Sequence, residues 1–391
     1  ILLAESSSDL QLLLNNFSQY CNNWKLRINV SKTKVMVFTR GRISNNLKFC
    51  IEKEEIEIVK HYKYLGVILS RNASFFETRK YLRDQATKAM YSVIKKSRLN
   101  HLSIECQLEM FDKAVVPILL YGAEIWGYEN FDILERVHLK FCKHILKLKN
   151  STPNFMIYGE LGRYPISLYA KLRMINFWCR LLDNTNENKL SCILYKLLYI
   201  NYNNYGIGNK WILCIKKIFD ECGMSNVWHC QDYFNKKWIK LSIEQKLKDQ
   251  FRQEWCADLH QSSKGLCYRI FKTEFKFEKY LSTLPFNFLY TLCKFRCGNH
   301  RLPVETGRWQ TIPRSERSCN LCSSKDIGDE FHYIMSCNCF NIEREKYLPH
   351  YCNKNANIIK FKNVFSSENV VELEKLCRFI RYISLKVCPP G

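Results

Sequence analysis

The chain has 391 residues and a formal net charge of +23, because its 60 Lys and Arg residues outnumber its 37 Asp and Glu residues. Hydrophobic residues make up 47% of the chain, with only 14 Gly and 9 Pro, which excludes a disordered tail. At roughly 100–200 residues per domain, the length excludes a single small module and predicts about two to four domains.

The first 70 residues alternate between helical and strand patterns. Leu10, Leu14 and Cys21 recur at helical spacing behind the capping pattern that runs from Ser8 to Gln11, which predicts a helix over residues 9–24. Period-two patterns predict a hairpin of strands 26–30 and 34–39, then strands 47–51 and 56–59 around a charged turn. The run 62–69 is also rich in β-formers, so this part of the chain is mixed α/β.

After Asn72 the apolar residues recur with the period of a helix. The pattern predicts helices that include residues 82–94, 108–116, 133–148, 168–182, 243–259, 267–281 and 370–385. Residues 184–188 and 201–209 are rich in Asn and are expected to be polar loops. The predicted fold class is therefore α+β, with a small mixed part followed by a mainly helical one.

The sequence also bears on the compartment in which the chain works. Its most apolar stretch, residues 115–126, is interrupted by Pro117, Gly122 and Glu124 and is shorter than the roughly 20 residues of a spanning helix, so no membrane partner is expected. The first residues lack Met and a basic segment, so we expect no signal peptide and interpret the chain as a fragment. Twenty Cys in a long chain, mostly within apolar runs, favour a reducing, intracellular compartment.

Four residues near the C-terminus have the types and spacing of zinc ligands. Cys319 and Cys322 are separated by two residues, His332 follows, and Cys337 comes five positions later. Three thiolates and one imidazole fill a tetrahedral site, so the pattern predicts one structural zinc ion. Two alternatives stay open: ordinary core cysteines, or Cys339 in place of Cys337. A weaker second cluster consists of Cys293, Cys297 and His300.

The segment before this cluster is basic and carries two aromatic residues, Phe295 and Trp309. Cations beside stacking rings suit single-stranded nucleic acid, and a solvated charged surface is the alternative. The basic residues are Lys294, Arg296, His300, Arg301, Arg308, Arg314 and Arg317.

Signatures of a free-standing enzyme are missing from the sequence. It has no phosphate-binding Gly-x-x-x-x-Gly-Lys loop, no His-Glu-x-x-His and no Gly-x-Ser-x-Gly. Glu5 and Asp9, the first two carboxylates, lie where helix-capping and first-turn acids belong. We therefore interpret both as structural.

Several motifs in order resemble the C-terminal part of the polyproteins of LINE-type non-LTR retrotransposons, from the end of the reverse transcriptase onward. Residues 1–11 look like the segment that follows the family's Tyr-x-Asp-Asp box. The motif Asn29-x-x-Lys32-Thr33-Lys34 resembles the next palm motif, and Tyr64-Leu65-Gly66 resembles the primer-grip hairpin. Residues 117–126 look like the thumb, and residues 302–332 with the Cys/His set are similar to the C-terminal zinc knuckle region.

The resemblance implies four parts: a palm remnant with the primer-grip hairpin over residues 1–70, a helical thumb over 71–150, a helical connector over 151–310, and a zinc knuckle with a C-terminal helix over 311–391. The family's polymerase uses two divalent ions held by palm aspartates. Those aspartates are not in this chain. We therefore expect no catalytic residue here, magnesium only in the full-length polymerase, and a supporting role for Lys32 near the phosphates of the incoming nucleotide.

The resemblance also implies which residues contact nucleic acid. An ordinary turn lysine at position 32 and a solvated helix face at positions 79 and 83 are the alternatives. The implied partners are template RNA, primer or target DNA, the RNA–DNA hybrid and the missing N-terminal half of the polymerase, and the implied location is nuclear and cytoplasmic. The implied contact residues are Lys32, Lys34, Tyr64, Leu65, Gly66, Arg79, Arg83, Arg301, Arg308, Arg314 and Arg317.

The sequence thus predicts a nucleic-acid-binding C-terminal fragment of a retrotransposon RNA-directed DNA polymerase. Two rival interpretations are a non-catalytic, zinc-dependent nucleic-acid-binding protein derived from a retrotransposon, and a relic without function.

Overall fold

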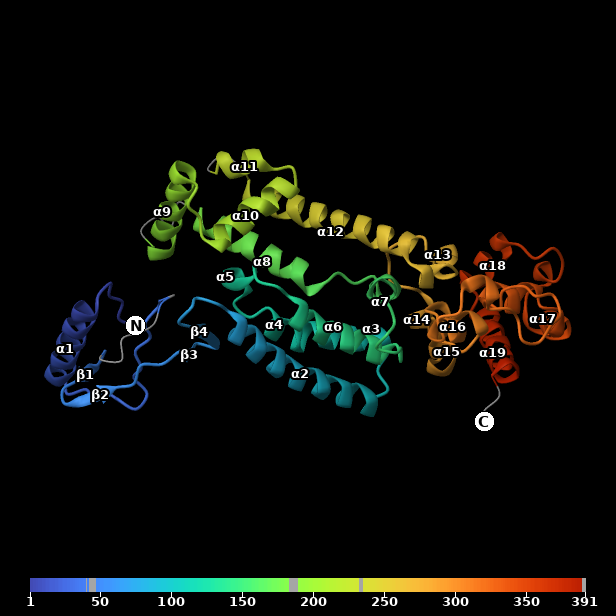
Figure 1. Cartoon of the computed structure of the whole chain (residues 1–391), viewed down its shortest axis with the longest axis horizontal. Coiled ribbons are helices and arrows are strands. Elements are labelled where there is room, and N and C mark those ends of the chain that lie inside the picture. The colour runs from blue at the N-terminus through green and yellow to red at the C-terminus, as the bar shows by residue number, and fades with distance from the viewer. Residues whose placement is uncertain (40, 42–46, 183–188, 232–234, 389–391) are drawn as a thin grey trace. The chain divides into compact units, whose positions relative to one another are not determined.

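A computed structural model describes residues 1–39, 41, 47–182, 189–231 and 235–388. It is mainly helical with two small antiparallel sheets, which confirms the predicted α+β class (Figure 1). The chain forms two compact units, residues 1–85 and 86–391. The predicted division into four parts stays a prediction.

The first unit begins with helix α1 (Ser7–Asn23), as predicted. The cap lies two residues earlier than expected, because the hydroxyl of Ser6 accepts a hydrogen bond from the backbone N–H of Asp9 at 3.1 Å. Ser6 is thus the N-cap, and Asp9 lies in the first turn of α1, where an acidic side chain is stabilising. Leu14 of α1 packs on strands β1 (Phe49–Ile51) and β2 (Glu54–Ile56), which form the hairpin expected around the charged turn.

The hairpin predicted from residues 26–30 and 34–39 is wrong. Asn29 closes a turn instead: its side-chain oxygen accepts from Lys32 N at 3.0 Å, and its carbonyl accepts from Thr33 N at 3.0 Å. Side-chain bonds of this kind compete with a strand ladder. In this stretch the described residues make one strand-like contact, a parallel bridge between Val35 and Ile58.

Strands β3 (His61–Tyr64) and β4 (Val67–Ser70) form a second hairpin whose tip is Leu65 and Gly66. The start of helix α2 (Phe76–Leu99) holds β4 in place, because the Thr78 hydroxyl accepts from Ile68 N at 3.0 Å and donates to Ile68 O at 2.7 Å. This helix continues into the second unit, where the predicted apolar stripe, which includes Ala86, Met90 and Val93, is buried.

The second unit opens with a group of packed helices that includes α8 (Ile166–Leu181). Gly127 permits the close packing, because a Cβ there would lie 2.4 Å from Ala123 O and 2.9 Å from Met174 Sδ. Glu135 joins three helices by accepting hydrogen bonds from Tyr158 Oη at 2.8 Å and from Ile166 N at 2.6 Å. The other helices here are α3 (Ile104–Ala114), α4 (Val116–Leu119), α5 (Ala123–Trp126), α6 (Asp132–Ile145) and α7 (Asn154–Leu161).

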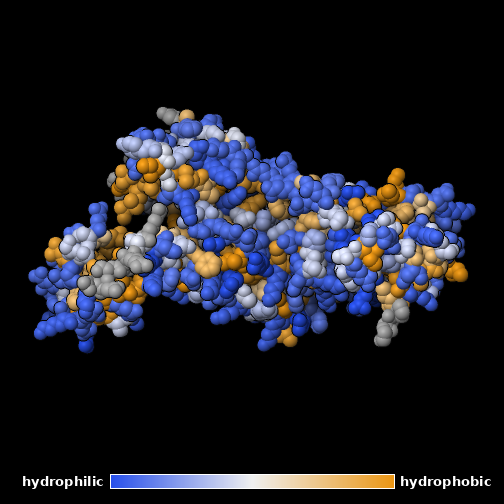
Figure 2. Space-filling view, in the orientation of Figure 1, coloured by the Kyte–Doolittle hydropathy of each residue, from blue (hydrophilic) through white to orange (hydrophobic). Residues whose placement is uncertain are grey.

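Four further helices follow: α9 (Leu190–Tyr205), α10 (Lys210–Glu221), α11 (Ser225–His229) and α12 (Lys236–Gln261). The loop predicted over residues 201–209 is wrong in its first half, since α9 continues to Tyr205 and ends at Gly206, whose φ is +68°. The loop predicted over 184–188 lies outside the described residues. Exposed apolar side chains, including Leu190, Leu194 and Leu197, lie along α9, where Figure 2 shows an orange area.

The remaining elements are also helical, with η denoting 3-10 and π turns. They are η2 (Ser263–Gly265), α13 (Tyr268–Phe271), α14 (Tyr280–Thr283), α15 (Phe286–Arg296), α16 (Pro303–Trp309), η3 (Arg314–Glu316), η4 (His332–Ser336), η5 (Asn338–Phe340), α17 (Asn341–Tyr347), η6 (His350–Cys352), α18 (Ile358–Phe365) and α19 (Val370–Val387). Helix α19 was expected from the apolar pattern over 370–385.

The helix predicted over residues 267–281 is wrong, because buried charges divide it. The Lys272 ammonium lies in the core, where it donates to Lys276 O at 2.8 Å and pairs with Glu278. Arg296 of α15 is equally buried and pairs with Glu160 of α7 at 3.0 Å and with Glu278 at 2.9 Å. The segment between α13 and α14 therefore contributes residues to a buried polar network, which the helical periodicity of the sequence does not reveal.

None of the described helices combines the length and the apolar composition that a membrane-spanning helix requires.

Candidate metal centre

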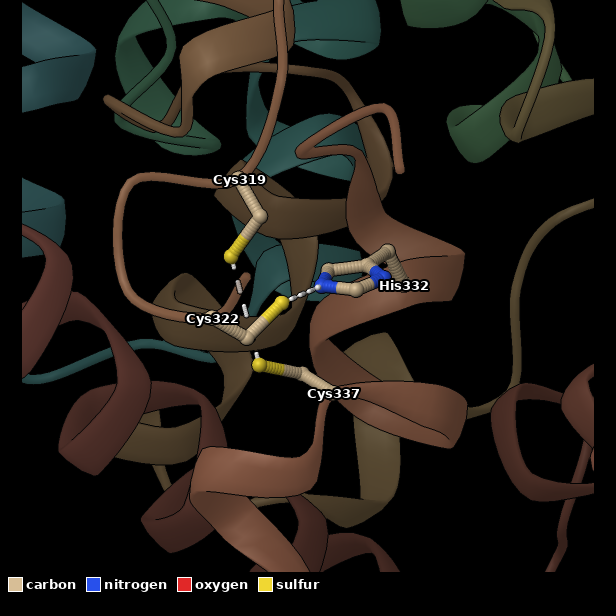
Figure 3. A group of neighbouring side chains, drawn as sticks. All are labelled: Cys319, Cys322, His332 and Cys337. Carbon is tan, nitrogen blue, oxygen red and sulfur yellow. Dashed lines mark hydrogen bonds between the residues drawn. The ribbon is translucent and has the colours of Figure 1, made fainter. Parts of the chain in front are cut away.

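The four predicted zinc ligands converge on one point (Figure 3). Cys319 and Cys322 lie in the loop after η3, His332 begins η4, and Cys337 directly follows η4. One ligand atom from each residue lies within 4.8 Å of all the others. Cys319 Sγ is 4.0 Å from Cys337 Sγ, and Cys322 Sγ is 3.4 Å from His332 Nε2.

These separations suit a tetrahedral ion. With Zn–S bonds of about 2.3 Å and a Zn–N bond of about 2.0 Å, two sulfur ligands lie about 3.8 Å apart and a sulfur and a nitrogen about 3.5 Å apart. Both distances are close to those found between the paired ligand atoms. The group can therefore hold a metal ion, and its donor set is compatible with zinc.

Local hydrogen bonds shape the loop that carries the first two thiols. Cys319 N donates to Asp326 O at 2.8 Å, and Ser318 forms an antiparallel bridge with Ile327. Leu321 N donates to Cys319 Sγ at 3.4 Å, and the Ser324 hydroxyl lies 3.1 Å from Cys322 Sγ. The loop thus closes on itself and directs hydrogen-bond donors at both sulfur atoms.

The His332 ring is oriented from its other side. Its Nε2 faces the sulfur atoms, while Nδ1 lies 3.4 Å from the Ser336 hydroxyl and 3.6 Å from an Asp326 carboxylate oxygen. Groups placed like these fix the tautomer of a metal-binding histidine. Burial lowers the pKa of His332, which favours the neutral imidazole that binds metals.

The thiols differ in how readily they ionise. Burial raises the pKa of Cys337, whose side chain is fully enclosed. At Cys322 burial has the same tendency, but hydrogen bonds from Ser324 and from the neighbouring thiols bring its pKa below the ordinary 9.0.

The buried guanidinium of Arg344 donates to Cys337 O at 2.9 Å and to Ile334 O at 2.9 Å, which holds the end of η4. A closed set of four protein ligands leaves no open position for catalysis.

Two other predicted metal-binding arrangements do not assemble. Cys339 is exposed, donates to Leu321 O at 3.4 Å and is not part of the cluster of ligand atoms. Cys293, Cys297 and His300 form no ligand group among the residues that the structure describes. His300 instead contacts Glu330 at 2.9 Å.

Most of the predicted basic contact residues near the metal centre already bind other parts of the chain. Arg308 donates to the hydroxyl and carbonyl of Ser263 at 3.0 and 3.1 Å. Arg314 pairs with Asp329 at 2.7 Å, and Arg317 donates to Ile312 O at 2.8 Å and Val304 O at 2.9 Å. Arg301 is exposed.

In the first unit, the predicted residues lie around the two turns. Lys32 is exposed at the Asn29 turn, and its carbonyl accepts from Tyr62 Oη at 3.4 Å. Lys34 pairs with Glu57 at 2.8 Å. At the tip of the second hairpin, Leu65 is 73% exposed with a φ of +46°, and Gly66 has a φ of +83°. Tyr64 beside them is 40% exposed.

The predicted charged face at the start of α2 is wrong at one position. Arg79 is 7% exposed and lies over the Phe76 ring at 5.7 Å, so it is a core residue instead of a surface cation. Arg83 pairs with its neighbour Asp84 at 2.7 Å.

Sequence reasoning missed the residues that support the metal ligands. Asp326, Ser336 and Arg344 carry no motif of their own, and only the folded loop brings them to His332 and Cys337. The polar character of the segment between the two ligand pairs was a signal for Asp326 alone, because Ser336 and Arg344 lie outside that segment.

Comparison with known proteins relates this chain to mobile-element polymerases. It is 24% identical over 162 residues to the RNA-directed DNA polymerase from mobile element jockey of Drosophila melanogaster, covering 40% of this chain and 17% of that protein. It is 28% identical over 137 residues to the probable RNA-directed DNA polymerase from transposon X-element of the same fly, covering 34% and 15%. The predicted resemblance to LINE-type non-LTR retrotransposon polymerases is confirmed.

A putative transposon-derived protein of Caenorhabditis elegans is 26% identical over 178 residues, which cover 44% of this chain and 62% of that protein. The aligned stretches thus span less than a fifth of each fly polymerase and under two thirds of the worm protein. No family model and no solved structure matches the chain.

Proposed function

We propose that this chain is a nucleic-acid-binding part of a retrotransposon RNA-directed DNA polymerase, with template RNA and primer or target DNA as its partners. The observation that carries the proposal is its similarity to mobile-element RNA-directed DNA polymerases. The 391 residues contain no Tyr-x-Asp-Asp box, so we assign binding to them and leave polymerisation and its magnesium ions to the full-length polymerase.

The Cys₃His cluster would hold one structural zinc ion. Zinc is the ion best suited to three thiolates and one imidazole, and a closed site of this kind stabilises a small fold. The segment between Ser318 and Asp329 is polar and supplies little hydrophobic core. In this chain the ion would stabilise the segment instead. The ion would thereby fix the loop of Cys319 and Cys322 against η4, whose Tyr333, Ile334 and Met335 are already buried in the core.

The β3–β4 hairpin would contact the primer strand. Leu65 adopts a left-handed backbone conformation that costs a residue other than glycine about 1–3 kcal/mol, and its side chain is largely exposed. Asn would suit this turn better, because two-residue hairpin loops with positive φ favour Asn-Gly. Contact with a partner would explain an apolar side chain at a strained, exposed tip. Gly66 would let the backbone of the primer strand approach closely.

A second function draws on the worm relative. Because the matched stretch covers 62% of a transposon-derived protein, a non-catalytic nucleic-acid-binding role outside a polymerase is the alternative that a specific observation favours. Both proposals share the same binding chemistry, and they differ in whether an N-terminal polymerase half is a partner.

The test is the affinity of the purified chain for a fluorescent RNA–DNA hybrid, measured by anisotropy. We expect binding by the wild-type chain and weaker binding by Leu65→Asn, which keeps the turn but removes the apolar tip. Leu12→Asn, on the exposed side of α1, is the matched control and should bind as the wild type does. If the wild-type chain binds neither the hybrid nor single-stranded RNA, the proposed function is overturned.

A further inference from the structure

A basic cavity of about 400 Å³ lies in the second unit, and none of its lining residues belongs to the metal centre. Three of its walls come from the ends of α2 and α6 and from the start of α15, and Gln107 of α3 also lines it. Sites for small organic ligands have volumes of about 300–1,000 Å³, so the cavity has room for one nucleotide unit. The basic residues in its lining are Arg98, His101, Lys143, His144 and Lys147.

Two walls of the cavity are built from the same helix-ending motif. Helix α2 ends with Leu102 N donating to Ser97 O at 3.1 Å, and α6 ends with Leu148 N donating to Lys143 O at 2.9 Å. Each bond spans five residues and closes a Schellman motif around a residue in the left-handed conformation. Both motifs lie at the same cavity, because residues of each line it.

The left-handed position of both motifs holds a basic residue instead of glycine. His101 has a φ of +49° and Lys147 a φ of +52°. Glycine is the usual residue here, since a side chain in this conformation costs free energy. A cation at a helix C-terminus is favourable in itself, and Lys25 after α1 has the same φ of +52°. What distinguishes His101 and Lys147 is that both line one cavity.

The third wall is aromatic. Phe286 and Tyr290 of α15 are stacked, with ring centroids 5.9 Å apart and an interplanar angle of 15°. Lys147 Nζ lies 4.0 Å from the centroid of the Tyr290 ring. Exposed base faces stack on rings of this kind, and an adjacent cation can bind the phosphate of the same nucleotide.

The charge of the cavity is uncompensated. No Asp or Glu is among the described residues that line it. Burial lowers the pKa of His144, and the positive charges of Arg98 and Lys147 lower it further. Ser97, which is 4% exposed, also lines the cavity, and its hydroxyl has no hydrogen-bond partner among the described residues. An anion would relieve the repulsion between the cations.

We propose that this cavity binds single-stranded RNA, with a phosphate beside Arg98 and Lys147 and a base stacked on the Phe286–Tyr290 pair. The inference rests on the proposed function, because the relatives are RNA-directed polymerases and a single strand exposes both its phosphates and its base faces. The sequence predicted nucleic-acid contacts at Arg308, Arg314 and Arg317, but these residues already bind other parts of the fold. The contacts proposed here come instead from cavity residues, which no sequence motif marks.

The test exploits the left-handed backbone of Lys147. Lys147→Gly removes the charge but suits the φ of +52°, so the variant should unfold at the same temperature as the wild type or higher. Its affinity for a single-stranded RNA oligonucleotide should fall about three- to tenfold, and the slope of log affinity against log salt should decrease by about 0.7. Lys25→Gly makes the same change at the same φ outside the cavity and should bind RNA as the wild type does.

A second variant tests the aromatic wall. Tyr290→Leu keeps an apolar side chain of similar bulk, and loss of base stacking should weaken RNA binding about fivefold or more. RNA binding that both cavity variants leave unchanged would overturn this inference while the proposed function stands. Tighter binding of single-stranded DNA than of RNA would overturn the assignment to RNA, and a wild-type chain that binds no nucleic acid would overturn both proposals.

Discussion

At the scale of single residues, the metal centre separates cysteines that the sequence could not tell apart. Cys337 and Cys339 lie two positions from each other, but Cys337 is fully buried beside Cys319, whereas Cys339 is exposed and bonded to a backbone carbonyl. The short turn after η4 decides which thiol faces the cluster, because the buried Arg344 holds the carbonyl of Cys337.

This difference predicts the metal content of two matched variants. Wild-type chain should contain about one zinc ion, Cys322→Ser should lose it, and Cys339→Ser should retain it. Inductively coupled plasma mass spectrometry measures the content, and the absorption of the cobalt-substituted chain reports thiolate ligation. Full zinc occupancy in Cys322→Ser, or its loss in Cys339→Ser, would refute the ligand assignment.

At the scale of elements, buried charges join helices that are far apart in sequence. Glu160 of α7 accepts hydrogen bonds from Arg296 of α15 and from Tyr280 of α14, while Arg296 Nη1 donates to Phe365 O of α18 at 3.3 Å. Arg296 also lies over the Phe271 ring at 4.5 Å. Burying these charges is costly, so the network contributes to stability only when every member is present.

Glu160→Gln should therefore lower the free energy of unfolding by about 3–5 kcal/mol at neutral pH, as measured by urea denaturation. The control is Glu274→Gln, which removes an exposed ion pair with Lys276 and should leave the midpoint unchanged. Equal stability of Glu160→Gln and the wild type would contradict this role.

The difference in free energy of unfolding between the wild type and Glu160→Gln should depend on pH, and the pKa of Glu160 gives the sign of this dependence. Burial alone would raise the pKa of Glu160, but the charges of Arg296 and Lys272 hold it below the ordinary 4.5. The contribution of the ionised group is thus present above the pKa of the unfolded state and is lost as the pH falls through the lower, folded-state pKa. The stability difference between wild type and Glu160→Gln should shrink in acid.

At the scale of the whole molecule, the charge of +23 is the dominant feature. Many basic side chains are paired within the fold, as Lys34, Arg83 and Arg314 are, yet the excess over carboxylates is too large for pairing to remove. Such an excess attracts polyanions irrespective of their sequence.

Binding of RNA and of RNA–DNA hybrid should accordingly weaken steeply with salt. The logarithm of the association constant should fall linearly with the logarithm of the salt concentration, because bound phosphates release their counterions. Anisotropy titrations between about 50 and 200 mM salt measure the slope. A flat response would show that the excess charge is not what binds.

The sequence was sufficient to predict those elements whose structure is determined by a local pattern. The periodicity of residues 9–24 and 370–385 predicted α1 and α19, and the Cys/His spacing predicted the four residues that converge. Zinc ligands need only a tight turn and a short helix between them, so their geometry is nearly contained in their spacing.

Tertiary structure decided the rest, for identifiable reasons. Asn29 closes a turn where alternation suggested a strand, and buried Lys272 divides an expected helix, since local side-chain bonds and core charges override periodicity. The basic cavity joins residues near positions 98, 145 and 290, and no sequence window contains all of them. Only the packing of three helix ends brings their charges and rings together.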